Sequence, residues 1–221
     1  MKKLLFYSLL FLLSATTIRA QTDTSKIGKL PQDDLLNELT IKDSSSIPLL
    51  PSHIMITQRM LWGKKGLMRN FDAFELTPEK RQHELKIRRT MLVTHQVVGF
   101  ATLAGMIAQG VVGTKLYNGD AEIKDLHKSL GLYVNIGFFT TAGLSLFAPP
   151  KMINDRKGYS SVKLHRALGI LSITAMIATD ILAGQLDKNN YENYDKLKPY
   201  HRAAAFTAFG SFALQIIAIK F

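Results

Sequence analysis

Four histidines in the second half of the chain stand in the same short pattern, and their imidazole groups could bind a metal. The four copies are His95-Gln-Val-Val-Gly99, His127-Lys-Ser-Leu-Gly131, His165-Arg-Ala-Leu-Gly169 and His201-Arg-Ala-Ala-Ala205. On a helix, the Gly or Ala four residues after each His lies one turn away on the same face. Each segment therefore offers an imidazole beside bare backbone, on which a flat macrocycle held by the His could rest.

The 221 residues contain no cysteine, which excludes several kinds of metal and redox site. Disulfides, thiolate metal sites, iron–sulfur clusters and covalently attached haem all require cysteine. With thiolates absent, histidine is the metal ligand that the sequence pattern points to. The formal charge of +11 favours anionic partners or lipid head groups, and nucleic acid is a poor candidate for an exported membrane chain.

The first 87 residues are expected to lie outside the membrane. Residues 1–20 have the charged start, short apolar core and small final residue of a secretory signal peptide. Without Lys2, Lys3 and Arg19, the mature charge would be +8. Residues 21–46 are polar and predict a linker, whereas residues 47–74 predict an irregular segment on the membrane surface or on the bundle.

The elements that must position the histidines are four apolar segments, which come after a predicted helix start at Thr77-Pro78-Glu79. The segments are residues 91–117, 126–147, 164–186 and 200–221, with Lys198-Pro199 leading into the last. Each has about 20 residues or slightly more, the length that crosses a hydrocarbon core of about 30 Å. Many small residues within them favour close helix packing. The sequence predicts an all-α fold, with a transmembrane antiparallel four-helix bundle over residues 88–221.

The alternating direction of the spans sorts the histidines into two pairs. Every His lies at the N-terminal end of its span, so His95 and His165 share one side of the membrane and His127 and His201 share the other. Inward-pointing ligands on diagonal helices can hold one iron from both faces. Roughly 14 residues between the two levels predict a separation on the order of 20 Å.

This arrangement resembles the cytochrome b-561 family of di-haem transmembrane electron carriers. The resemblance covers about residues 88–221 and rests on Thr94-His95, Leu126-His127, Leu164-His165 and Tyr200-His201, spaced by 32, 38 and 36 residues. It implies that the chain binds two b haems, with the four histidines as ligands to iron, and that it acts as a transmembrane oxidoreductase. The two additional flanking helices of the eukaryotic members have no counterpart here, and no ascorbate-binding motif is matched.

Two signals disagree about orientation. A cleaved signal peptide places residues 21–87 in the periplasm of a bacterium, with the bundle in the inner membrane. The count of Lys and Arg instead places the side of His95 and His165 in the cytoplasm. We follow the signal peptide, because polar regions of this length can translocate despite their charge.

Other readings of the same residues stay open. The predicted partners are lipid and a redox donor and acceptor, such as quinol, a periplasmic redox protein or a metal ion, with a homodimer or a larger complex as the assembly. The alternatives are a non-haem structural subunit of a membrane complex and a His-based protein of transition-metal transport or sensing. His53 and His83 are expected to have surface roles. Asp180, inside the third span, is expected to hydrogen-bond to another helix.

Overall fold

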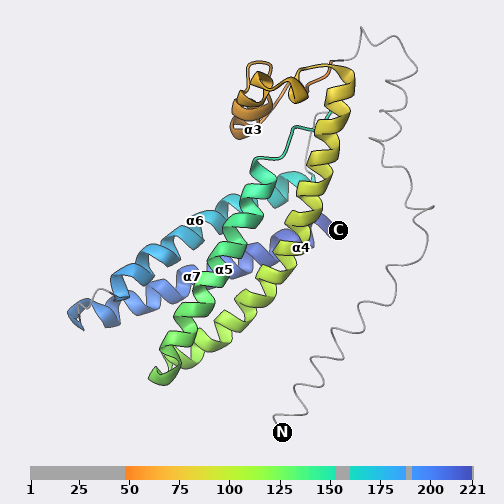
Figure 1. Ribbon diagram of the computed structural model, residues 1–221. Coiled ribbons are helices and arrows are strands. Elements are labelled where there is room, and N and C mark those ends of the chain that lie inside the picture. Colours follow the sequence, from red (N-terminus) through yellow and green to blue (C-terminus); the bar gives the residue numbers. More distant parts are fainter. Residues whose placement is uncertain (1–47, 153–159, 188–190, 221) are drawn as a thin grey trace. The chain divides into compact units, whose positions relative to one another are not determined.

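The computed structural model describes residues 48–152, 160–187 and 191–220. The predicted signal peptide and the linker over residues 21–46 lie outside this part of the chain. Within it, secondary structure is helical: one short helix and two 3-10 turns precede the first of four long helices, and a third 3-10 turn follows that helix (Figure 1). The all-α prediction is confirmed for the described residues.

The first long helix, α4 (Pro78–Tyr117), runs without a break from outside the predicted bundle to the end of the first span. It begins where the sequence indicates, because the Thr77 side chain accepts a hydrogen bond from the Lys80 backbone N–H and proline occupies the first helical position. It ends before Gly119, whose φ of 106° is a conformation that favours glycine. A 3-10 turn, η3 (Ala121–Ile123), then leads into the next helix.

Helices α5 (Lys124–Leu146), α6 (Ser161–Asp187) and α7 (Tyr191–Lys220) complete two antiparallel hairpins, α4 with α5 and α6 with α7 (Figure 1). Each of the four helices is long and apolar enough to cross a membrane. Large apolar side chains such as Val97, Ile136 and Ile170 are exposed on their outer faces, as lipid contact requires. The four-helix bundle of an integral membrane protein is therefore confirmed.

The expected start of the last helix at residue 200 is wrong. α7 begins at Tyr191, and Pro199 lies inside it. Proline removes one main-chain hydrogen bond there, which leaves the Asp195 carbonyl without its helical partner. Residues 193–196 are exposed, so water can satisfy that carbonyl. An early proline is thus compatible with a helix that continues on both sides of it.

The two hairpins are internal repeats of each other. His165 follows His95 by 70 residues, and His201 follows His127 by 74. The offset of 70 also relates other positions of α4 to α6, and the offset of 74 relates positions of α5 to α7. Met106-Ile107-Ala108 recurs as Met176-Ile177-Ala178. In the core, Met106, Val134 and Phe138 match the buried residues Met176, Ala208 and Phe212. The apolar core is therefore built from equivalent positions of both hairpins, between the two histidine levels.

The segment before α4 packs on the end of α5. We call residues 50–75 the cap; it contains α3 (Ile56–Trp62) and the 3-10 turns η1 (Leu67–Asn70) and η2 (Asp72–Phe74). Five consecutive carbonyls at the end of α5 each accept a hydrogen bond from a side chain of the cap or of α4. The pairs are Thr57 with Leu146, Trp62 with Phe147, Gln58 with Ala148, Arg88 with Pro149 and Arg81 with Pro150. The sequence predicts that residues 47–74 lie either on the membrane surface or on the bundle. The described part of this segment packs on the bundle.

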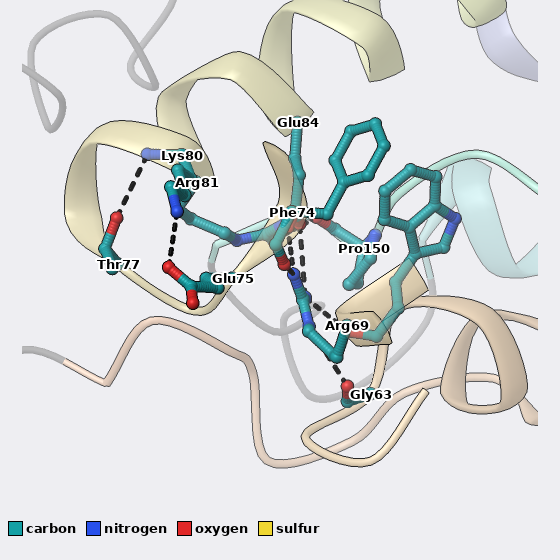
Figure 2. Close-up of polar contacts among 10 residues, drawn as sticks. Gly63, Arg69, Phe74, Glu75, Thr77, Lys80, Arg81, Glu84 and Pro150 are labelled. Atoms are coloured by element: carbon teal, nitrogen blue, oxygen red, sulfur yellow. Dashed lines mark hydrogen bonds and ion pairs between the residues drawn. The ribbon is translucent and has the colours of Figure 1, made fainter. Parts of the chain in front are cut away.

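A buried ion cluster joins the cap to α4 (Figure 2). The Glu84 carboxylate, fully buried, receives hydrogen bonds from Arg69 of the cap and from Arg81 one turn earlier on α4. Arg69 also donates to the Gly63 and Phe74 carbonyls. Because every charge in the cluster has partners of opposite charge or carbonyl oxygens, the desolvation of three ionised groups is compensated.

Candidate functional site: two histidine pairs

The structure brings the four histidines together in the two pairs that the sequence predicts. His95 on α4 faces His165 on α6, with 6.2 Å between ring centres and 74° between ring planes. His127 on α5 faces His201 on α7, with 6.4 Å and 79°. Each pair joins one helix of the first hairpin to one helix of the second. Both hairpins are therefore needed to complete either pair.

The spacing within each pair fits two imidazoles bound to opposite sides of one metal ion. With about 2 Å for a metal–nitrogen bond and about 1.1 Å from that nitrogen to its ring centre, two ligands on opposite sides of one ion would have ring centres about 6.2 Å apart. A direct hydrogen bond between the rings would bring the centres to about 5 Å. The observed 6.2 and 6.4 Å agree with the first geometry, and they also lie in the range of ordinary edge-to-face ring contacts. The ring spacing of each pair therefore fits one metal ion held by two histidines.

Three of the four rings are oriented by a main-chain carbonyl of the other helix in the same hairpin. Nδ1 of His95 lies 2.7 Å from the Thr141 carbonyl oxygen, and Nδ1 of His165 lies 3.0 Å from that of Gln215. Nδ1 of His201 lies 3.0 Å from the Thr179 carbonyl oxygen. A carbonyl only accepts, so Nδ1 carries the proton and Nε2 is the nitrogen with a lone pair for a metal. This is the tautomer that a haem ligand requires.

His127 differs from the other three. The repeat would place the Gln109 carbonyl against its Nδ1, but that nitrogen is buried without a hydrogen-bond partner. The Gln109 side-chain amide instead donates to the His127 carbonyl over 3.0 Å, and its nitrogen lies 3.4 Å from His127 Nε2. Gln109 Oε1 is also buried and unpartnered. The contacting residues Gln109 and His127 thus each have one buried polar atom without a partner.

A cavity of about 440 Å³ opens beside the second pair, and residues of all four long helices line it. His127 and His201 are in its wall, with Gln109 and Asn135. The unpartnered atoms Gln109 Oε1, His127 Nδ1 and Asn135 Oδ1 all belong to this lining. Because buried polar atoms normally have partners, water or a bound group in the cavity would have to satisfy these three atoms. The cavity volume is in the usual range for ligand sites.

Basic and aromatic side chains stand at one end of this cavity. Lys198 Nζ and Arg202 Cζ each lie 4.4 Å from the ring centre of Tyr117. Lys124 and Lys128 also line the cavity. Four cationic side chains at a largely apolar pocket would favour a ligand with an apolar body and negatively charged ends.

The small residues of the repeated pattern lie against the partner helix of the same hairpin. A Cβ added to Gly99 would be 3.4 Å from Thr141 Cγ2, and one added to Gly169 would be 3.3 Å from Gln215 Oε1. A Cβ added to Gly131 would be 3.1 Å from Gln109 Nε2. These glycines thus let α4 approach α5, and α6 approach α7, where the histidines meet carbonyls. Gly131 and Ala205 also line the cavity, and the predicted contact of the four small residues with a macrocycle stays a prediction.

The two pairs lie at levels 14 residues apart along the helices. His95 meets the Thr141 carbonyl, which follows His127 by 14 residues, and His201 meets that of Thr179, which follows His165 by 14. At 1.5 Å per residue, the levels are about 21 Å apart. The rings of Phe138 and Phe212 meet within the core between them, with centres 5.4 Å apart.

Asp180 lines the cavity beside the second pair, whereas His83 lies apart from both pairs. Asp180 accepts a hydrogen bond of 2.9 Å from Asn135 of α5, which confirms the expected helix-to-helix contact. The His83 ring stacks on Phe74, with centres 5.9 Å apart. In the described ranges, no group of three or more His, Asp or Glu side chains is placed to hold a metal ion.

Sequence reasoning missed the residues that orient the rings. Thr141, Thr179 and Gln215 act through main-chain carbonyls, which carry no side-chain signal. Gln109 and Gly113 could have been found from the internal repeat, since both stand opposite His127 when the hairpins are aligned. No protein-family model, curated protein or solved structure matches the chain.

Proposed function

We propose that the chain is a transmembrane electron carrier with two b haems, one held by His95 and His165 and the other by His127 and His201. It would pass electrons between a donor and an acceptor on opposite sides of a bacterial inner membrane. Bis-histidine haem supplies an iron that exchanges electrons without binding substrate directly. The resemblance to the cytochrome b-561 family supports the same reading of the four-helix core.

The observation that carries the proposal is the spacing of the two ring pairs. Separations of 6.2 and 6.4 Å suit one iron each, and they recur at two levels about 21 Å apart. A hydrocarbon core of about 30 Å would then leave each pair roughly 5 Å inside one edge. Two metal centres so placed connect the two surfaces of the membrane.

The protein's own groups hold and isolate the two sites. The carbonyls of Thr141, Gln215 and Thr179 keep the proton on Nδ1 in three of the four rings, those of His95, His165 and His201. Between the levels, the apolar core around Phe138 and Phe212 excludes water. The cations Lys198 and Arg202, beside the second pair, would balance carboxylates of the bound group or attract an anionic redox partner.

A reduced-minus-oxidised absorption spectrum of the purified chain tests the proposal. We expect b-type bands, and a pyridine haemochrome assay should give two haems per chain. His95→Ala and His127→Ala should each remove one haem, because each pair needs both ligands. His83→Ala is the matched control and should retain two, since its ring stacks on Phe74 outside both pairs. A chain without b-type bands would instead support a structural subunit or a metal-transport protein.

A further inference from the structure

The outer face of the cap exposes large apolar side chains. On α3, Ile56 and Met60 are one turn apart and are 76% and 63% exposed. After α3, Leu67 and Phe71 are 59% and 58% exposed. The opposite side of α3 is used by Trp62, whose indole is buried against the end of α5. The cap is thus an amphipathic element, and these four apolar side chains stay exposed among the residues that the structure describes.

Basic residues outnumber acidic ones in this segment. The cap contains Arg59, Lys64, Lys65 and Arg69, against Asp72 and Glu75 at its end. Arg69 is used by the buried cluster with Glu84, whereas the side chains of Arg59, Lys64 and Lys65 are exposed. Exposed apolar side chains together with an excess of basic ones are typical of segments that lie in the surface of an anionic membrane.

The position of the cap places this face at the height of the membrane surface. Thr57, Gln58 and Trp62 donate to the carbonyls of residues 146–148, where the apolar helix α5 ends. Phe147, at that same end, is 48% exposed. A segment fixed to the last turn of a spanning helix is therefore held beside the lipid head groups.

We propose that the cap docks on the surface of the membrane that the bundle spans. Ile56, Met60, Leu67 and Phe71 enter the boundary between head groups and acyl chains, and the three exposed basic side chains contact phosphates of anionic lipid. This surface does not depend on the haem proposal, because none of its residues belongs to a histidine pair.

Spin labels can test this docking in the full chain, since it has no cysteine and each single-Cys variant carries one label. Met60→Cys places the label on the outer face of α3. Glu79→Cys is the control, exposed on the first turn of α4. In vesicles of phosphatidylglycerol and phosphatidylcholine, we expect the label at 60 to be several-fold less accessible to a water-soluble nickel complex, and more accessible to oxygen, than the label at 79.

A second comparison tests the charged half of the surface. In phosphatidylcholine alone, the label at 60 should become more accessible to nickel, and Lys64→Gln with Lys65→Gln should produce the same increase in the mixed vesicles. Equal nickel accessibility at 60 and 79 in both lipids would overturn the proposal. Dipolar broadening between labels at 60 would also overturn it, because a second copy of the chain would then cover the face.

Discussion

The ring of His127 on α5 rests directly on Gly113 of α4. A Cβ atom built on Gly113 would lie 2.9 Å from Cε1 of that ring, closer than real side chains approach. The ring nitrogen Nδ1 would be 3.3 Å from the same atom. Gly113 therefore sets the position of one predicted ligand without contributing a side chain, and the bare backbone beside the ring comes from a neighbouring helix.

Gly113→Ala should displace the His127 ring and release the haem of the second pair. The added methyl group leaves no space for the ring in its present place, although alanine favours the helix itself by up to about 1 kcal/mol. We expect one haem per chain by pyridine haemochrome. Gly210→Ala on α7 is the matched control, since a Cβ there meets nothing within 4 Å, and it should retain two. Equal haem content in the two variants would count against this role of Gly113.

The pairing of the histidines could be predicted because it depends only on order and direction along the chain. Each His opens an apolar span, and successive spans run in opposite directions, so first and third must share a side. His95 with His165 and His127 with His201 follow from that alone, and the ring pairs agree. The helix start at Thr77 was likewise marked by its own side chain and by the proline after it.

Sequence reasoning could not predict hydrogen bonds between side chains and main-chain carbonyls. The carbonyls of residues 146–150 determine how the cap is attached, yet any residue type offers a carbonyl. For the same reason, the partners of the histidine Nδ1 atoms were not foreseen. The early start of α7 was missed because Pro199 indicates a boundary locally, whereas a helix can continue past one lost hydrogen bond.

Gln109→Leu should raise the reduction potential of the second haem. We expect the Gln109 amide oxygen to accept from Nδ1–H of His127 when Nε2 binds iron, and losing that acceptor makes the ligand less basic. A hydrogen bond of about 1 kcal/mol corresponds to about 40 mV for one electron. Potentiometric titration of the absorption bands measures the shift. Gln215→Leu is the control, because His165 is held by the main-chain carbonyl of that residue; a similar shift there would contradict the assignment.

Glu84→Leu should strongly destabilise the attachment of the cap. The change leaves Arg69 and Arg81 buried without a counter-ion, for which the usual cost is about 3–5 kcal/mol. We expect the lower end, because both guanidinium groups keep hydrogen bonds to carbonyls. The measurement is thermal unfolding of the purified chain by circular dichroism.

The exposed ion pair of Glu75 with Lys80 provides the control for that change (Figure 2). Solvent and salt screen such pairs, so Glu75→Ala should change the free energy of unfolding by less than about 1 kcal/mol. If Glu84→Leu and Glu75→Ala lowered the unfolding temperature equally, the buried cluster would not be what holds the cap to α4.

Gly99→Leu should disturb the haem of the first pair while both of its ligands remain. A Cβ at residue 99 would make an ordinary contact of 3.4 Å with Thr141 Cγ2, so Gly99→Ala is expected to keep two haems. The longer leucine side chain must push α5 away, and the Thr141 carbonyl that orients His95 moves with it. We therefore expect Gly99→Leu to weaken or shift the absorption bands of one haem only. A normal spectrum in Gly99→Leu would show that close packing of α4 on α5 is not needed to hold the first site.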